Sequence, residues 1–329
     1  PIASVGPNIG SYDDSSVVRG NAYYYRVGVI KGGSEAIGEE RNIAAGVPFY
    51  FVTGSSVNNT VKRLDKKGNE IWSFSGHGNV VWNVDVSLFG NVYSAASDNT
   101  VRKIDSDGNE IWTFTGHTTY VRSVAVDPFT EYVYSGDRNG TLKRIDPNGN
   151  QVWSIKPITG AIWSIDVDSN GNACLALQNS TVMKVSSTGN ILWSYSMHSN
   201  DVFDIAVDNY NYIYTASVDN TARKIDPDGN EVWTFTGHTG RVAGVAVDSN
   251  GYVYTASYDT TVKKIDSSGN EVWSSNVPGS EANAVGVDSD GNVYASSYKN
   301  EIVKFDPNGN LLWTSDVQVG EIRGLKVIG

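Results

Sequence analysis

Seven tryptophans recur along this 329-residue chain at almost constant intervals, and this repeat constrains the fold more than any other feature. The intervals are 40, 41, 40, 40, 40 and 40 residues, and each Trp stands three residues after the Asn of a Gly-Asn pair. The repeated residues are Trp72, Trp112, Trp153, Trp193, Trp233, Trp273 and Trp313. A period of about 40 residues is typical of an array of small units, none of which buries its apolar face alone.

Each unit contains four short strands. The unit at residues 242–273 divides into four runs in which apolar and polar residues alternate. Turn-forming residues separate the runs at positions 248–251, 259–260 and 266–270. Alternation with a period of two predicts β-strands, and no segment shows the periodicity of a helix.

The units at the two ends of the array are incomplete and complement each other. Only three strands precede Trp72, at about residues 49–51, 60–64 and 70–74, and only one follows Trp313, at 321–328. If the last strand joins the first sheet, the chain closes into a ring with no open end. We therefore predict an all-β, seven-bladed β-propeller of four-stranded blades over residues 49–329.

The repeats resemble two propeller families. Residues 237–248 are similar to the opening of a WD40 repeat, with a Gly-His pair and a Val four residues after the His. Ile-Asp pairs at 104–105, 225–226 and 265–266 stand in the place of the Trp-Asp pair of that family. The tryptophan lies instead in the next strand, in GNEIW or GNEVW, which resembles PQQ-like propeller repeats. Both resemblances imply a propeller, a fold that hosts many unrelated functions.

The first 48 residues follow a different pattern. The Tyr-rich run at 21–27 and the Gly-Gly-Ser turn at 32–34 resemble the last strands of a fibronectin type III domain. The first strands of such a domain are missing, so we expect upstream sequence or a partner chain to complete residues 1–48. A two-stranded arm lying on the propeller is the alternative.

Composition excludes several classes of function. The net charge of −11, without a basic block, argues against nucleic-acid binding. A single cysteine, Cys174, excludes an internal disulfide, a CxxC pair and a thiolate zinc cluster. No apolar run is long enough to span a membrane, and residues 1–10 lack a signal core. We expect no cofactor, no metal and no membrane insertion.

All four histidines occupy one repeated position, five residues after a repeat tryptophan. The WD40 resemblance implies that this His contacts an Asp in the turn between the second and third strands. We therefore expect structural pairs, with His117 facing Asn139 instead. The pairs are His77 with Asp98, His198 with Asp219 and His238 with Asp259. The repeat tryptophans are likewise expected to be buried between blades.

The positions that break the repeat are the candidates for function. In WD40 proteins the residue after the first Val or Ile of the first strand lies near the rim of the central channel. Here this residue varies from unit to unit, and so does the residue two positions earlier. Aromatic residues and arginines dominate binding interfaces, so we predict a binding surface at this rim. Packing of these rings between blades is the alternative. The predicted binding residues are Trp82, Tyr120, Arg122, Trp163, Phe203, Arg241, Asn283 and Arg323.

A second irregular position lies deeper on the same strand. It holds Asp85, Asp166 and Lys326, whereas most other units have a small residue there. Ring closure makes the strands of Lys326 and Asp85 neighbours, which predicts an ion pair or a water-bridged contact beside the channel. Asp166 has no obvious partner.

These features predict a non-enzymatic module that binds a protein or a surface glycan. Modular phage tail, virion and bacterial cell-surface proteins carry similar combinations of domains, and we expect the chain to belong to such an assembly. The alternative is a propeller enzyme, a lyase or a glycan-active hydrolase, that uses Asp85, Asp166 or Glu321 for acid–base chemistry.

Overall fold

The computed structural model describes four short strands between residues 22 and 44 and most of the chain from residue 50 on. The ranges are 22–25, 28–31, 34–37, 41–44, 50–55, 58–196, 198–299, 301–316 and 322–328. The chain divides into two compact units, residues 50–327 and the remainder. No helix of the length and hydropathy needed to cross a membrane is found among the described residues.

The N-terminal unit contains two separate antiparallel pairs. Strand β1 (Ala22–Tyr25) pairs with β4 (Arg41–Ala44), and β2 (Gly28–Lys31) pairs with β3 (Ser34–Ile37). The rest of the segment for which a fibronectin-like fold is predicted lies outside the described residues. That fold remains a prediction.

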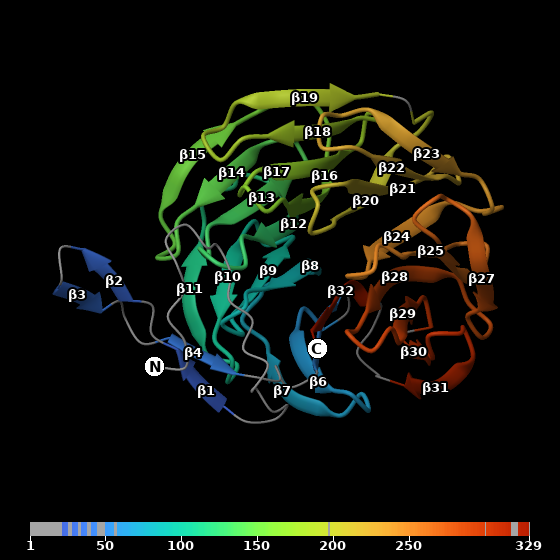
Figure 1. The fold of residues 1–329 in the computed structure, drawn as a ribbon, viewed down its shortest axis with the longest axis horizontal. Coiled ribbons are helices and arrows are strands. Elements are labelled where there is room, and N and C mark those ends of the chain that lie inside the picture. The colour runs from blue at the N-terminus through green and yellow to red at the C-terminus, as the bar shows by residue number, and fades with distance from the viewer. Residues whose placement is uncertain are drawn as a thin grey trace. The chain divides into compact units, whose positions relative to one another are not determined.

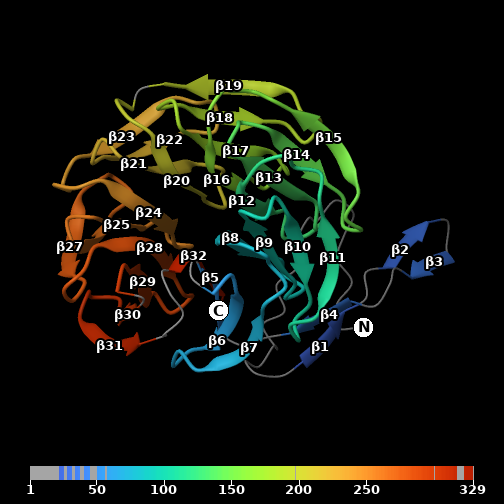
Figure 2. The same cartoon turned by 180° about the vertical axis from the view of Figure 1, so that it is seen from behind.

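Residues 50–327 form seven four-stranded sheets around a central channel, with the first strand of each sheet innermost (Figures 1 and 2). Blade 1 orders its strands β32 (Ile322–Ile328), β5 (Tyr50–Ser55), β6 (Val61–Asp65) and β7 (Glu70–Phe74). The C-terminal strand therefore completes the N-terminal blade. The predicted seven-bladed propeller and the predicted closure of its ring are both confirmed.

Blades 2 to 7 each use four consecutive strands. Blade 2 is β8 (Val81–Val86), β9 (Val92–Ala96), β10 (Val101–Ile104) and β11 (Glu110–Phe114), and blade 3 is β12 (Val121–Val126), β13 (Val133–Asp137), β14 (Leu142–Ile145) and β15 (Gln151–Ile155). Blade 4 is β16 (Ile162–Val167), β17 (Ala173–Leu177), β18 (Val182–Val185) and β19 (Ile191–Tyr195), and blade 5 is β20 (Val202–Val207), β21 (Ile213–Ser217), β22 (Ala222–Ile225) and β23 (Glu231–Phe235). Blade 6 is β24 (Val242–Val247), β25 (Val253–Ser257), β26 (Thr261–Ile265) and β27 (Glu271–Asn276), and blade 7 is β28 (Ala282–Val287), β29 (Val293–Ser297), β30 (Glu301–Phe305) and β31 (Leu311–Asp316).

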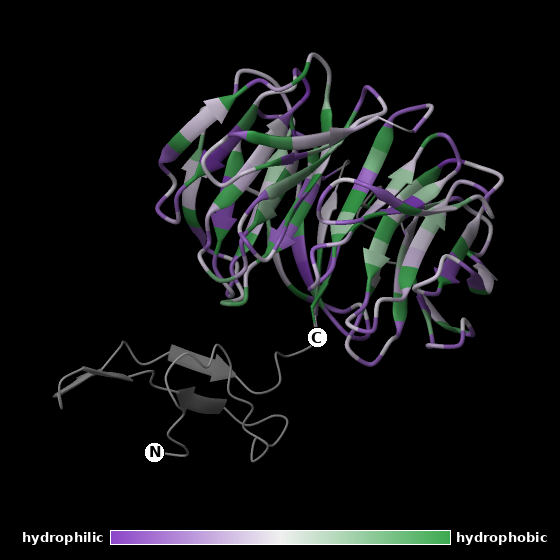
Figure 3. Ribbon diagram, turned by 45° about the horizontal axis from the view of Figure 1, so that its top comes forward, coloured by the Kyte–Doolittle hydropathy of each residue, from purple (hydrophilic) through white to green (hydrophobic). Residues whose placement is uncertain are grey.

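The hydrophobic core lies between neighbouring blades. One cluster joins Tyr134 and Leu142 of blade 3 to Ile162 and Leu175 of blade 4. The second strand of a blade is buried along its whole length, as in blades 2 to 4, whereas the outermost strands are largely exposed. Apolar residues accordingly concentrate within the strands, and polar residues mark the turns (Figure 3). Each blade buries both of its faces only because it has a neighbour on each side.

The repeat tryptophan and the repeat glycine are two halves of one contact between blades. The Trp153 indole Nε1 donates a hydrogen bond of 2.9 Å to the Ser187 carbonyl, in the last turn of the next blade. In that type of turn Gly229 has a φ of +94°, and a Cβ at Gly229 would lie 2.9 Å from Trp193. Only glycine fits both this backbone conformation and this space. The same indole-to-carbonyl bond is made by Trp72, Trp112, Trp193, Trp233 and Trp273.

The prediction that these tryptophans are buried is wrong in degree. The rings lie between blades, but each is only partly buried, because it stands on the outermost strand of its blade, at the circumference of the ring. Part of each indole therefore remains in solvent.

Replacing Trp153 by Ala should destabilise the propeller by about 2–3 kcal/mol, below the roughly 3–5 kcal/mol of a fully buried Trp. Trp153→Phe should lose less, since it keeps the ring and removes only the hydrogen bond to Ser187. Chemical denaturation of the variants measures both values. Equal stability of Trp153→Ala and wild type would contradict the proposed contact.

Candidate binding site at the mouth of the central channel

A β-bulge in the first strand of each of blades 2 to 7 determines where most of the predicted rim residues lie. In blade 2, Val81 pairs with Ala96 and Asn83 pairs with Ala95, which leaves Trp82 without a partner in the ladder. A bulge of this kind redirects the side chain of the extra residue. The residues at the corresponding bulges are Arg122, Trp163, Phe203, Ala243 and Asn283. All six line a central cavity of about 570 Å³.

Seven side chains contact one another in a row around the mouth of the central channel, and we call them the crescent. They are Trp82, Arg122, Trp163, Phe203, Arg241, Tyr258 and Tyr298, from blades 2 to 7 in order.

The first half of the crescent alternates rings and a guanidinium. The Arg122 guanidinium carbon lies 3.7 Å from the centre of the Trp82 ring and 4.8 Å from that of Trp163. Trp163 stacks on Phe203, with ring centres 4.9 Å apart and planes inclined by 16°. Both kinds of contact are favourable, because a ring face attracts a cation and offset rings attract each other.

The second half continues the same pattern. The Arg241 guanidinium carbon lies 5.1 Å from the centre of the Phe203 ring and 3.4 Å from that of Tyr258. Tyr258 and Tyr298 meet edge to face with ring centres 5.1 Å apart, and their hydroxyls are hydrogen-bonded. The variable rim residues thus pack mainly on one another across blades, and most of them also line the cavity.

The other predicted rim residues take no part in the crescent's stacking contacts. Tyr120 is 41 % exposed. Asn283 lines the cavity and donates a hydrogen bond of 3.1 Å to the Ile322 carbonyl of blade 1. The side chain of Arg323 lies outside the described residues, as does Glu321.

Sequence analysis missed Tyr258 and Tyr298. Their position directly follows the second strand, and the Tyr258 amide donates a hydrogen bond of 3.0 Å to the Arg241 carbonyl. The positions of Arg241 and Tyr258, which both vary from blade to blade, are therefore neighbours across the sheet. The signal was present, because the Tyr258 position holds Ser97, Arg138, Gln178 and Val218 in blades 2 to 5.

Lys326 and Asp85 form an ion pair on the wall of the channel. Lys326 Nζ lies 2.8 Å from Asp85 Oδ1, and the side chains are 41 % and 9 % exposed. The charge of Asp85 raises the pKa of Lys326 well above its ordinary value, and burial opposes this effect only partly. The contact joins blade 1 to blade 2, where the ring closes.

The channel carboxylates connect the first strands of neighbouring blades. Asp166 accepts hydrogen bonds from the amides of Val167 and Val207, at 2.9 and 2.7 Å, and Asp85 accepts one from Val126 at 2.9 Å. Burial raises the pKa of Asp166 to about 6. The amides of Val207 and Val126 thereby find an acceptor on the preceding blade.

Asp204 belongs to the same set and was also missed. It accepts hydrogen bonds from the Val245 amide at 3.0 Å and the Ser164 hydroxyl at 2.8 Å, and burial raises its pKa. Asp204 shares the strand position of Asn83, two residues before that of Asp85, so the irregular position of Asp85 does not point to it.

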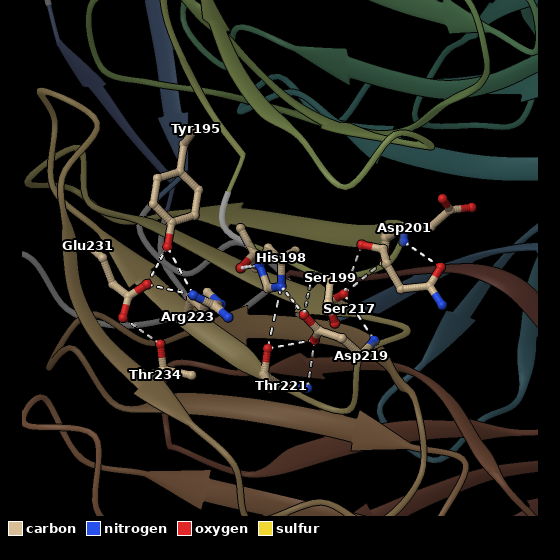
Figure 4. A network of polar contacts seen from close by, with 12 residues as sticks. Tyr195, His198, Ser199, Asp201, Ser217, Asp219, Thr221, Arg223, Glu231 and Thr234 are labelled. Atoms are coloured by element: carbon tan, nitrogen blue, oxygen red, sulfur yellow. Dashed lines mark hydrogen bonds and ion pairs between the residues drawn. The ribbon is translucent and has the colours of Figure 1, made fainter.

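The histidines stand in closed hydrogen-bond networks, and Figure 4 shows the one around His198. His198 Nδ1 lies 2.9 Å from Asp219 Oδ2, and its Nε2 lies 2.9 Å from the Thr215 hydroxyl. The Ser199 amide and the Thr221 hydroxyl donate to the same carboxylate. His77 and His238 repeat this arrangement, at 3.0 Å from Asp98 and 2.8 Å from Asp259.

The expectation that His117 faces Asn139 is wrong. His117 Nδ1 lies 3.2 Å from Oδ2 of Asp137, a residue at the end of β13. Asp137 stands two positions earlier than the aspartates of the other blades. Its carboxylate nevertheless reaches the same point, and its other oxygen accepts the amides of Asn139 and Thr141.

These networks occupy both nitrogens of every histidine. Within the described residues, no group of three or more His, Cys, Asp or Glu side chains is placed to hold a metal ion. The site therefore consists of stacked aromatic and guanidinium groups above a polar channel.

Comparison with known proteins assigns the family. The family described as "Outer membrane protein assembly factor BamB" matches residues 138–240 and 218–327, more than half of the chain. The chain belongs to this family. The family described as "WD domain, G-beta repeat" matches residues 68–105 and 108–146. The first family is one of PQQ-like repeats and the second is the WD40 family, so both predicted propeller resemblances are confirmed.

The remaining comparisons concern the fold alone. No curated protein matches the chain significantly. Among solved structures, the crystal structure of the computationally designed Ika8 protein resembles it with a TM-score of 0.68 and 22 % sequence identity. The match covers 84 % of this chain and 86 % of the designed one.

Acid should destabilise the propeller through its His–Asp pairs. Burial alone would raise the pKa of Asp259, but hydrogen bonds from Thr261 and His238 lower it to about 2; burial lowers the pKa of His238. Because both folded-state pKa values lie below the unfolded ones, the stabilisation is complete above about pH 6.5. It falls in two stages, as His238 and then Asp259 take up protons.

Asp259→Asn should therefore cost about 1–2 kcal/mol at pH 7 and flatten the pH dependence of Tm between about pH 4 and 2. Asp228→Asn, at an exposed turn of blade 5, is the control and should leave the profile unchanged. Parallel profiles for Asp259→Asn and wild type would contradict the pairing.

Lys326→Met should destabilise the ring by about 1–3 kcal/mol, because it leaves the Asp85 carboxylate on the channel wall without its cation. The value lies below the roughly 3–5 kcal/mol of a fully buried pair, since Lys326 is partly exposed. Adding Asp85→Asn should recover part of the loss. Denaturation of the wild type, the two single variants and the double variant measures this coupling. Additive losses would mean that the pair contributes nothing.

Proposed function

We propose that this propeller is a non-enzymatic interaction module that binds a protein partner at the crescent. The observation that carries the proposal is the crescent itself, seven stacked side chains on six blades at positions where the repeat varies. Aromatic residues and arginine contribute most of the binding energy in protein interfaces. Propeller repeats commonly mediate protein interactions, and the family assignment agrees with this role.

The stacking favours a protein over a glycan as the ligand. Trp163 and Phe203 each contact crescent members on the preceding and on the following blade, so their ring faces already have neighbours. A sugar ring needs an open aromatic face on which to stack. A protein partner can instead contact the ring edges.

Asp166 is the observation that favours the enzyme alternative, a lyase or a glycan-active hydrolase. A carboxyl group with a pKa of about 6 in a cavity suits acid–base catalysis. However, both of its oxygens accept main-chain amides, so the group has a structural role without any substrate. Hydrolysis or elimination of a glycan that Asp166→Asn abolished would support the enzyme instead.

We further propose that the chain works within a larger extracellular or envelope assembly. The family name describes a factor of outer membrane protein assembly, which supports a place at the cell envelope. A phage virion or tail and a bacterial cell-surface assembly are the settings that the fibronectin-like segment at residues 1–48 suggests. In either setting, upstream sequence or a partner chain would complete that segment.

Cross-linking in the native assembly tests the binding surface. A photoreactive residue in place of Tyr120, beside the crescent, should yield a cross-link to a partner protein. Trp163→Ala should weaken that partner's binding at least tenfold, as expected when an interface loses a central aromatic residue.

Leu192→Ala is the matched control, because Leu192 is half-exposed on the outermost strand β19, away from the channel. It should bind as the wild type does. Cross-links that form only from residues 1–48, with Trp163→Ala binding normally, would make the propeller a passive domain and refute the proposal.

A further inference from the structure

Three residues that break the repeat meet at one point of the crescent. Arg241 and Tyr258 belong to blade 6, and Tyr298 belongs to blade 7. The position of Arg241 holds Val80, Tyr120, Ala161, Asp201 and Glu281 in blades 2, 3, 4, 5 and 7. Among blades 2 to 7, only blade 6 has an arginine at this position, and only blades 6 and 7 have a tyrosine at the position of Tyr258. Repeated architecture does not require this combination.

Arg241 packs against aromatic rings and has no counter-ion among the residues that the structure describes. Its guanidinium lies between the rings of Phe203 and Tyr258, and its Nη2 lies 3.4 Å from the Tyr298 hydroxyl. The Nε atom is buried and has no hydrogen-bond acceptor among the described residues. In the same part of the chain, no carboxylate lies within 4.0 Å of this guanidinium.

The cavity gives a ligand access to this cation. Arg241 and Tyr298 both line it. The Arg241 side chain is only partly buried, so its terminal N–H groups are open to an anion that enters the cavity. Because stacking on Phe203 and Tyr258 fixes its plane, the N–H groups of Arg241 form a preorganised fork that matches the two oxygens of a carboxylate.

We infer that Arg241 is the carboxylate-binding subsite of the crescent, and that it takes an Asp or Glu side chain of the protein partner. The Tyr298 hydroxyl, at the edge of the fork, contacts the same group. This inference rests on the proposed function and specifies the chemistry of its ligand.

The surroundings favour a single negative charge over a phosphate. The hydrogen-bond partner of Arg241 is the neutral Tyr298 hydroxyl, and Asp166 and Asp204 line the same cavity. These carboxylates would repel a doubly charged group more strongly than a singly charged one. The net charge of −11 also opposes long-range attraction of an acidic partner, so recognition comes from the local contact.

A short peptide tests the subsite directly. Acetyl-Gly-Glu-Gly-amide is titrated into the full chain while the Arg Nε–Hε resonances are followed by NMR, with the Arg241 signal assigned from its loss in Arg241→Lys. We expect this signal to shift with a Kd of about 1–10 mM, as for one bidentate ion pair. The Gln peptide should bind at least tenfold more weakly.

Arg144→Lys is the matched control. Arg144 also stacks on a ring, 4.0 Å from the centre of Tyr132, but it donates to the Ser187 carbonyl and does not line the cavity. Peptide binding should survive Arg144→Lys and fall about tenfold in Arg241→Lys, which keeps the charge but not the fork. Unchanged Tm in both variants would show that they fold.

Three results would overturn the inference: equal shifts with the Glu and Gln peptides, normal binding by Arg241→Lys, or tighter binding of sodium glucuronate than of the peptide, which would assign the subsite to a sugar acid. The proposed function fails separately. If Trp163→Ala abolishes partner binding while the peptide gives no shift at Arg241, the crescent remains the interface and only the carboxylate assignment is lost.

Discussion

The propeller depends on the contact in which an indole of one blade packs on a glycine turn of the next. This contact explains why Trp and Gly-Asn recur together, because each needs the other on the adjacent blade rather than on its own. It also anchors the circumference of the ring, where the outermost strands have lost most of their burial. The inner strands are joined differently, by carboxylates that accept main-chain amides across the channel wall. A regular outer contact therefore leaves the inner end of each blade free to vary.

The bulges determine where the variable residues of the first strands lie. A regular ladder would place Trp82, Arg122, Trp163 and Phe203 in line with their strands, where their side chains would face the neighbouring blades. The bulge instead sends these side chains to the channel mouth, where they stack. One local irregularity, repeated in blades 2 to 7, thus converts a variable sequence position into a continuous surface. This is how a fold shared by unrelated proteins carries a site of its own.

Period and alternation were sufficient to predict the number of blades, the strands of each blade and the closure of the ring, because these follow from where apolar residues must be buried. The bulges were not predicted, although they leave a trace in the sequence: the apolar residues of the first strand are spaced three and then two apart, as at Val81, Val84 and Val86, where strict alternation would space them two apart throughout. Asp137 shows a related limit. The position of a residue in the repeat indicates which turn it occupies, whereas its carboxylate can reach the same histidine from two positions earlier. Tyr258 and Tyr298 were missed because comparison stopped at the first strand, although the register places them beside Arg241.

Ring closure also has a consequence for how the chain is made. Strand β32 joins β5 across about 270 residues, so blade 1 leaves the ribosome three-stranded and waits for its fourth strand until those residues have been made. Closing so long a loop is entropically costly, and contacts of this kind form slowly. Until then, β5 presents an unpaired edge that can recruit a strand from another chain. The nascent protein is thus most open to mispairing after the first three strands of blade 1 have been made and before β32 pairs with β5.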